Sequence, residues 1–188
     1  MRRVGLYFGS FNPVHNGHLM LAQWILNNGY VDEVWFVVSP QNPFKENKEL
    51  LPSELRLEML RLSVEKDQRM RACDIELSLP TPSYTINTLR ALYSRYPNIS
   101  FSMIMGADNV PGLHKWREAE AIFNMCEILV YPRDNMPIPN VDGAIIHLMD
   151  SAPQFDVSST LLRQWLREGK SICHYTPSCV TELMQNKL

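Results

Sequence analysis

The stretch Gly9-Ser10-Phe11-Asn12-Pro13-Val14-His15-Asn16-Gly17-His18 decides how this chain begins to fold. The apolar run at residues 4–8 precedes it, and a helical pattern that begins near residue 18 follows it. This order predicts a strand, a tight turn and a helix start, whose free backbone N–H groups and positive dipole end favour an anion. His15 and His18 stand three residues apart and share one side of the first helical turn. The stretch therefore predicts a phosphate site.

The composition is that of a globular protein: 188 residues, of which 45% are hydrophobic and 20% charged. This length predicts a single domain over residues 1–188, with a helical C-terminal portion from about residue 156 to 188. The formal net charge of −2 provides no basic field, so we expect no nucleic-acid polymer as partner. No apolar stretch approaches the roughly 18–20 residues of a membrane span, so we expect no membrane partner.

The cysteines, Cys73, Cys126, Cys173 and Cys179, have neither metal-site spacing nor the pattern of a disulfide framework. Ordinary buried thiols in a reducing cytoplasm fit this pattern, and no protein metal site is expected. A metal site formed by Cys173, His174 and Cys179 is an alternative that we rank below this interpretation.

Strand and helix patterns alternate along the chain. Strands are predicted at residues 3–8, 33–39, 70–75, 99–105, 127–131 and 144–149, and helices at 16–28, 53–66, 85–95, 116–123, 161–168 and 177–187. The core face of the second helix is expected to carry Leu55, Met59 and Leu62. Repeated strand–helix–strand units predict an α/β fold, a doubly wound Rossmann-like parallel sheet with helices on both faces.

Two cations are expected near the carboxyl ends of strands, outside which ligands bind in open α/β sheets. Lys45 lies in the loop at residues 40–45, from which it would reach a triphosphate as a mobile point charge. A solvated loop lysine is the alternative. Arg133 lies just past the strand at 127–131 and is expected at the same edge of the sheet.

A second phosphate-suited helix start is Ser158-Ser159-Thr160-Leu161-Leu162-Arg163. Its two serines are natural N-cap residues, which is the purely structural interpretation. Ser159 and Arg163, however, stand at i and i+4, so a hydroxyl and a guanidinium share one face of the helix. The planar donor fork of arginine suits phosphate oxygens.

The two motifs together resemble the signatures of the adenylyltransferase superfamily of nucleotidyltransferases, and the resemblance covers essentially the whole chain. Val157 stands before the serines, where the family often has isoleucine, and Asn12 replaces the more usual aspartate. In the middle of the chain, Pro82-Ser83-Tyr84-Thr85 and Gly106-Ala107-Asp108, followed by Trp116, resemble the bacterial nicotinate-nucleotide adenylyltransferases.

This resemblance implies that ATP and nicotinate mononucleotide are the partners, and that deamido-NAD and pyrophosphate are the products. The substrate phosphate would attack the α-phosphorus of ATP in line. No general base is needed, because a phosphate monoester with a second pKa near 6 is already an anion at neutral pH. The expected cofactor is Mg²⁺, bound mainly through ATP phosphates and water.

The resemblance also implies a set of site residues. The catalytic residues are His18, His15, Lys45 and Arg163. The ATP-binding residues are Gly9, Ser10, Phe11, His15, His18, Gly106, Asp108, Ser158, Ser159, Thr160 and Arg163, with Asp108 at the adenosine ribose. The substrate-binding residues are Ser83, Tyr84, Thr85, Trp116 and Arg133. Trp116 would stack on the nicotinate ring and Thr85 would help to hold its carboxylate; a core aromatic and a simple helix cap are the alternatives.

Four other functions were weighed. Phosphopantetheine adenylyltransferases share both end motifs but lack the features from the middle of this chain. An enzyme that prefers the nicotinamide nucleotide and a non-catalytic nucleotide sensor are the next alternatives. A dehydrogenase is disfavoured because the first turn lacks the Gly-x-Gly-x-x-Gly spacing. Residues 132–142, rich in proline, are compatible with a lid or with an interface in a homo-oligomer.

Overall fold

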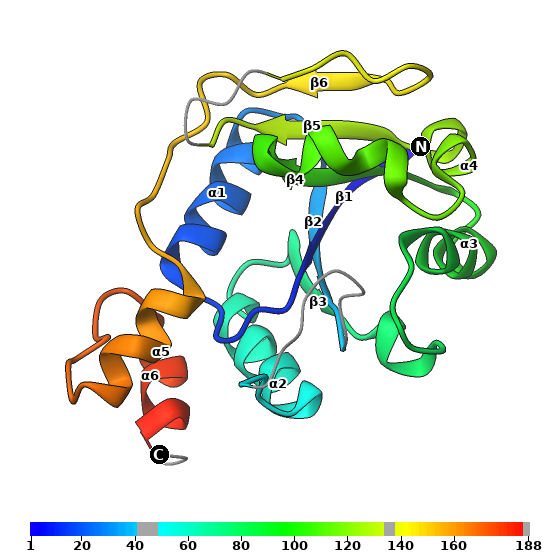
Figure 1. The fold of residues 1–188 in the computed structure, drawn as a ribbon. Helices are drawn as coiled ribbons and strands as arrows, with labels where there is room; N and C mark the ends of the chain where they lie inside the picture. Colours follow the sequence, from blue (N-terminus) through cyan, green and yellow to red (C-terminus); the bar gives the residue numbers. More distant parts are fainter. Residues whose placement is uncertain (41–48, 134–137, 186–188) are drawn as a thin grey trace.

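A computed structural model describes residues 1–40, 49–133 and 138–185 of the chain. Its centre is a parallel sheet of six strands in the order β3-β2-β1-β4-β5-β6 (Figure 1). The strands are β1 (Arg2–Gly9), β2 (Glu33–Val38), β3 (Met70–Cys73), β4 (Ile99–Gly106), β5 (Glu127–Tyr131) and β6 (Ile146–Leu148). The order reverses between β1 and β4, and the crevice at such a switch point is where open α/β sheets bind ligands.

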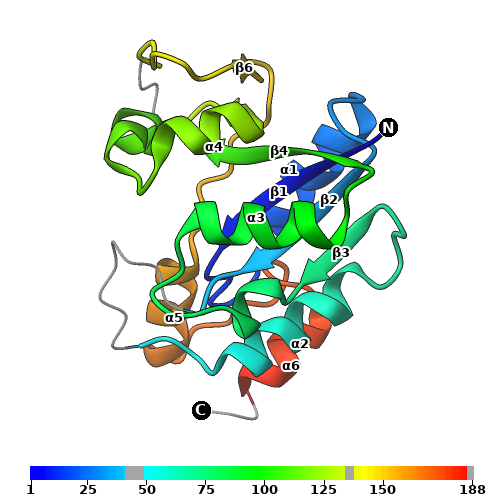
Figure 2. The same cartoon turned by 90° about the vertical axis from the view of Figure 1, so that its right-hand side faces the viewer.

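Helices cover both faces of the sheet (Figures 1 and 2). They are α1 (Asn16–Asn27), α2 (Ser53–Val64), α3 (Thr85–Arg95), α4 (Ala119–Met125), α5 (Ser159–Arg167) and α6 (Ser178–Gln185), with 3₁₀ segments η1 (Ile75–Ser78) and η2 (Ala107–Lys115). One buried cluster joins the sheet to α1, α2, α5 and α6, and a second joins its other face to α3, η2 and α4. The predicted doubly wound α/β fold is therefore confirmed.

The strand β2 shows why the sequence forms a two-sided core. Successive side chains of a strand point to opposite faces. Phe36 and Val38 belong to the cluster with α1 and α2, whereas Trp35 and Val37 belong to the cluster with α3 and α4. All four are at most 1% exposed, which explains why this segment reads as a continuous apolar run.

Two predictions about the elements are wrong. The helix expected at 116–123 begins only at Ala119, because residues 107–115 form η2 and Glu118 has a left-handed φ of 55°. Leu62, expected in the core, is 38% exposed, whereas Leu57 and Leu60 are buried. Leu55 and Met59 of the predicted stripe are buried, and because α6 also packs against α2, the buried face extends to Leu57 and Leu60 and leaves Leu62 outside.

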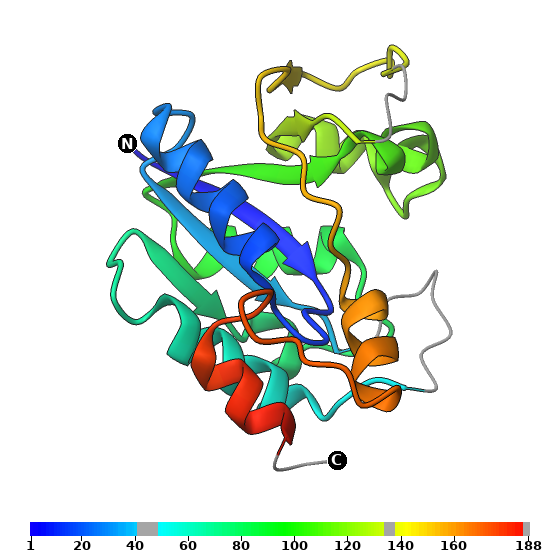
Figure 3. The same ribbon diagram turned by 90° about the vertical axis from the view of Figure 1, so that its left-hand side faces the viewer.

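The C-terminal segment returns to the beginning of α1, where α5 and the loop that leads to α6 lie beside the first turn (Figure 3). Asn16 makes this connection: its backbone N–H donates to the Tyr175 carbonyl at 2.8 Å, and its side chain donates to the His174 carbonyl at 2.7 Å. No helix in the described part of the chain is long and apolar enough to span a membrane.

Candidate active site

The first turn begins where β1 ends at Gly9. Phe11 has a left-handed φ of 45° and a ring that is almost fully buried. A Cβ atom on Gly9 would lie only 2.9 Å from this ring. Glycine is therefore required at position 9 mainly because of the packing of the Phe11 ring. Since that ring is buried, the part of Phe11 that is left to contact a ligand is its backbone.

Arg56 of α2 supports the turn after β1, a role that no sequence motif predicts. Its side chain has no exposed surface, and its guanidinium donates to the carbonyl oxygens of Ser10, Ser39 and Leu51. Ser10 follows β1 and Ser39 follows β2, so one buried cation ties two strand ends together. Burial lowers the pKa of Arg56. An arginine inside the apolar run Leu55-Arg56-Leu57 was the available signal.

The two histidines lie together, as predicted. Their rings stack with centroids 3.6 Å apart, and the His15 backbone N–H donates to His18 Nδ1 at 3.2 Å. Because Nδ1 accepts this bond, a neutral His18 ring carries its hydrogen on Nε2. Burial, followed by the charge of Arg133, lowers the pKa of His15 to about 4. Burial, His15 and Arg133 hold the pKa of His18 well below its usual range. Both rings are thus neutral hydrogen-bond donors at pH 7.

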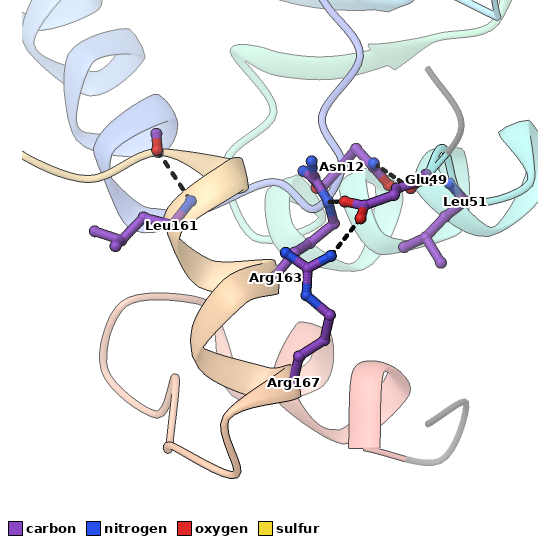
Figure 4. Close-up of polar contacts among 7 residues, drawn as sticks. Asn12, Glu49, Leu51, Leu161, Arg163 and Arg167 are labelled. Carbon is purple, nitrogen blue, oxygen red and sulfur yellow. Dashed lines mark hydrogen bonds and ion pairs between the residues drawn. The ribbon is translucent and has the colours of Figure 1, made fainter. Parts of the chain in front are cut away.

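The second motif packs directly on the first. Ser158 caps α5 by accepting a hydrogen bond from the Leu161 backbone N–H at 3.2 Å (Figure 4). The Ser159 hydroxyl donates to the Pro13 carbonyl at 2.8 Å, and Arg163 Nη1 donates to the Asn12 carbonyl at 2.7 Å. The two helix starts therefore form one site. Thr160 is exposed in the first turn of α5.

Gly17 makes this approach possible. A Cβ atom on Gly17 would lie 2.9 Å from Val157 Cγ1, so any larger residue would push the segment before α5 away from the histidines.

A carboxylate stands between two guanidinium groups at this site (Figure 4). Glu49 pairs with Arg167 and lies 3.6 Å from Arg163 Nε. Asn12 holds this segment in place, since its amide donates to the Glu49 carbonyl at 3.0 Å and accepts from the Leu51 backbone N–H at 3.1 Å. An aspartate at position 12 would lack the donor. Neither Glu49 nor Arg167 belongs to a sequence motif, so only the fold brings them forward.

A cavity of about 160 Å³ lies beside the turn after β1, at the carboxyl ends of β1 and β4. Predicted site residues that line it are Gly9, Ser83, Tyr84, Thr85, Gly106 and Trp116. Trp116 therefore faces the cavity, although it also contacts the core. Arg117, which was not predicted, also lines the cavity with its guanidinium 4.9 Å from the centre of the Tyr84 ring.

The start of α3 opens onto this cavity. The alternative role of Thr85 as a simple helix cap is wrong: Tyr84 is the N-cap residue, it makes no side-chain cap, and Thr85 is the first helical residue. The positive end of α3 is therefore available to an anion in the cavity.

Asp108 and Arg133 lie at the neighbouring strand end. The Asp108 carboxylate is 3.8 Å from the Arg133 guanidinium and accepts a hydrogen bond from Asn109 at 3.1 Å. A Cβ atom on Gly106 would overlap the Asp108 carboxylate, so glycine is required there. Arg133 thus lies at the sheet edge expected from the sequence. Lys45 lies outside the described residues.

No group of three His, Cys, Asp or Glu side chains within residues 1–40, 49–133 and 138–185 is arranged to hold a metal ion. This result argues against the alternative site at Cys173, His174 and Cys179. All four cysteines are free thiols. Cys73 and Cys126 are buried as expected, but the expectation is wrong for Cys173, which is exposed, and Cys179 is only partly buried.

Two helix starts that converge on the switch point of a parallel sheet, with neutral histidine donors and an arginine, define the site of a nucleotidyltransferase. The family model described as cytidylyltransferase-like matches residues 6–165, which is most of the chain. The chain therefore belongs to the cytidylyltransferase-like family.

Similar proteins narrow this class. A protein of Flavobacterium johnsoniae is 42% identical over 98% of this chain and 96% of its own length, and one of Bacteroides fragilis is 44% identical over 92% and 86%. Both are named "Probable nicotinate-nucleotide adenylyltransferase". The chain is a nucleotidyltransferase of this nicotinate-nucleotide adenylyltransferase group.

Solved structures support the fold. The nicotinic acid mononucleotide adenylyltransferase of Plasmodium falciparum, complexed with NaAD, superposes with a TM-score of 0.78 at 17% identity, covering 100% of this chain and 96% of its own. A putative nicotinate-nucleotide adenylyltransferase of Vibrio parahaemolyticus gives a TM-score of 0.74 at 21% identity, covering 99% of this chain and 100% of its own.

Proposed function

We propose that this protein transfers the adenylyl group of ATP to nicotinate mononucleotide and releases deamido-NAD and pyrophosphate. The observation that carries the proposal is the open N-terminus of α3 in the cavity lined by Trp116, next to the histidine turn. An aromatic pyridine with a carboxylate matches a flat indole beside a positive helix end. The names of the relatives support the same reaction.

The chemistry requires alignment rather than a general base. The attacking phosphate is already anionic at neutral pH, and the reaction brings it in line with the α-phosphorus of ATP. His18 Nε2–H and the His15 ring would donate to phosphate oxygens, where charge develops as pyrophosphate leaves. The turn amides from Gly9 to Phe11 would bind the same phosphates.

The remaining residues would hold the ends of the two substrates. Arg163, Lys45 and the start of α5 at residues 158–160 would bind the triphosphate tail, and Asp108 with Gly106 the adenosine ribose. Trp116 would stack on the pyridine ring, while Ser83, Tyr84 and Thr85 would surround its carboxylate. Arg133 would bind the substrate from the end of β5, at a phosphate or near the nicotinate ring.

Mg²⁺ would supply positive charge between the phosphates of ATP. A cation held mainly by phosphates and water fits a site whose described residues form no carboxylate or histidine cage. Free thiols at all four cysteines support a reducing cytoplasm as the location. A homo-oligomer stays a prediction, and residues 132–142 stay compatible with either an interface or a lid.

The experiment that tests this function measures pyrophosphate release with ATP and Mg²⁺ for three acceptors: nicotinate mononucleotide, nicotinamide mononucleotide and phosphopantetheine. We expect a strong preference for the first. Turnover with phosphopantetheine alone would contradict the assignment of the cavity. ATP binding without turnover of any acceptor would instead favour a nucleotide sensor.

A further inference from the structure

A buried carboxyl group, Glu76 of η1, borders the cavity and has no part in the reaction described above. Glu76 is 2% exposed, and its Oε1 accepts a hydrogen bond from the Thr88 hydroxyl of α3 at 2.7 Å. Its Oε2 has no hydrogen-bond partner among the described residues, and neither has the buried hydroxyl of Ser83. Both residues line the cavity together with Thr85 and Trp116. Neither oxygen atom is therefore in a well-formed hydrogen bond, although the Ser39 and Ser83 hydroxyls lie close enough to Glu76 to favour its ionised form, and both oxygen atoms stand where a ligand would bind.

Glu76 is the one carboxylate among the described residues that line this cavity. The other titratable or charged groups around it are Tyr7, Tyr84, Arg117 and Tyr131 in the cavity wall, with Cys73 at the end of β3. Burial raises the pKa of Tyr7, Tyr131 and Cys73, so these three groups stay neutral at neutral pH. Arg117 contributes a guanidinium group to the cavity wall.

The environment of Glu76 makes its charge sensitive to the ligand. Burial raises the pKa of Glu76, and the hydroxyl groups of Thr88, Ser39 and Ser83 oppose this shift. A carboxylate on a bound ligand would disfavour the ionised form further, because like charges in a buried site repel. A neutral amide on the same ring would not.

We propose that Glu76 is a specificity-determining residue that binds a proton when a pyridine nucleotide with a ring carboxylate occupies the cavity, and not when the ring carries an amide. This inference rests on the proposed function. The neutral acid removes a negative charge beside the substrate carboxylate and turns Oε2 into a hydrogen-bond donor. Discrimination between acid and amide then depends on pH.

The test is the ratio of kcat/KM for nicotinate mononucleotide to kcat/KM for nicotinamide mononucleotide, measured from about pH 5.5 to about pH 8.5. Titration of the histidines and of the substrate phosphate is common to both reactions and cancels in the ratio. For the native protein we expect the ratio to fall as pH rises above the pKa of Glu76, by up to about tenfold per pH unit.

Two variants separate this effect from a structural one. Glu76→Gln keeps the shape and a neutral donor, so we expect the ratio to become independent of pH and to stay high at alkaline pH. Thr88→Val removes the strongest of the three hydroxyl contacts that favour the ionised carboxylate, so the fall should move to higher pH. A native ratio that does not change with pH, or an unchanged slope in Glu76→Gln, would overturn the inference.

Should Glu76→Gln not fold, the inference would be overturned by a Thr88→Val protein whose ratio falls at the same pH as in the native protein. Absence of turnover with both nucleotides would contradict the proposed function instead.

Discussion

The histidine pair shows how a local backbone contact sets the chemistry of a side chain. The bond from the His15 N–H to His18 Nδ1 directs the remaining hydrogen of His18 to Nε2. Low pKa values keep both rings neutral at pH 7. The rings therefore act as oriented hydrogen-bond donors and not as charged imidazolium acids. Sequence spacing predicted the proximity of the rings, but the tautomer follows only from the geometry of the turn.

Replacement of His18 by alanine is expected to lower kcat about 100-fold or more, because a donor to charge that develops in the transition state is lost. The measurement is steady-state pyrophosphate release at saturating substrates. His147→Ala is the matched control, since His147 is exposed on β6 and pairs with Glu127. Unchanged kcat in a folded His18→Ala protein would rule out this role.

Stability is expected to depend on pH through His15. Its pKa is about 4 in the folded protein, and the ordinary value is about 6.5. The stabilising effect of the neutral ring is therefore complete above about pH 6.5 and is lost as pH falls toward about 4, with a total of roughly 3 kcal/mol. Urea unfolding across this range measures it. His15→Gln should make the profile less steep, with the part that comes from the lowered pKa of His18 remaining. An equally steep profile in that variant would assign the dependence to other groups.

At the level of secondary-structure elements, α2 contributes a buried cation to the site. Arg56→Met would leave the carbonyls of Ser10 and Ser39 without their donor, so we expect a loss of about 3–5 kcal/mol in the free energy of unfolding. Arg61→Met on the same helix is the control. Arg61 forms an exposed ion pair with Asp74, and its removal should cost less than about 1 kcal/mol. Equal losses in the two variants would show that the strand ends do not depend on Arg56.

At the phosphate site, helix α5 contributes the positive charges of Arg163 and Arg167, and the segment at residues 49–51 contributes the negative charge of Glu49. Arg163→Ala should raise the KM for ATP by about 10–100-fold, because charge-assisted hydrogen bonds to phosphate are lost. Glu49→Gln removes the carboxylate that a triphosphate has to displace, so the KM for ATP should fall about two- to fivefold. Initial rates at varied ATP measure both. An effect of Arg163→Ala on the nicotinate nucleotide alone would place the arginine elsewhere.

Sequence patterns predicted most elements because strands and helices bury residues at different periods. They failed at Leu62, because the packing of α6 on α2 changes which residues of α2 are buried. They also failed at Glu118, because a residue with left-handed backbone geometry makes α4 begin later than predicted. Glu49, Arg56 and Glu76 were not predicted as site residues. Their positions depend on packing between segments that are distant in sequence, and each alone resembles an ordinary charged residue.

At the scale of the whole molecule, the switch point of the sheet brings together segments from both ends of the chain. The turn after β1 meets α5 through Ser159 and Arg163, and meets the loop before α6 through Asn16. A ligand that orders this turn therefore also restrains the C-terminal segment. Occupation of the phosphate site should therefore reduce local opening of α6. Amide hydrogen exchange measures such opening.

We expect ATP to slow hydrogen exchange of the α6 amides in the native protein. In Asn16→Ala this slowing should be reduced, and the basal exchange of α6 should be about fivefold faster, because one hydrogen bond of about 1 kcal/mol is lost. Exchange in β4 serves as the internal reference and should not change between the two proteins. Thr181 and Met184 lie in α6, where buried side chains contact α2 and the adjoining loop, so their amides report the docked layer. Equal protection of α6 by ATP in both proteins would show that the turn and the C-terminal layer are coupled by a route other than Asn16.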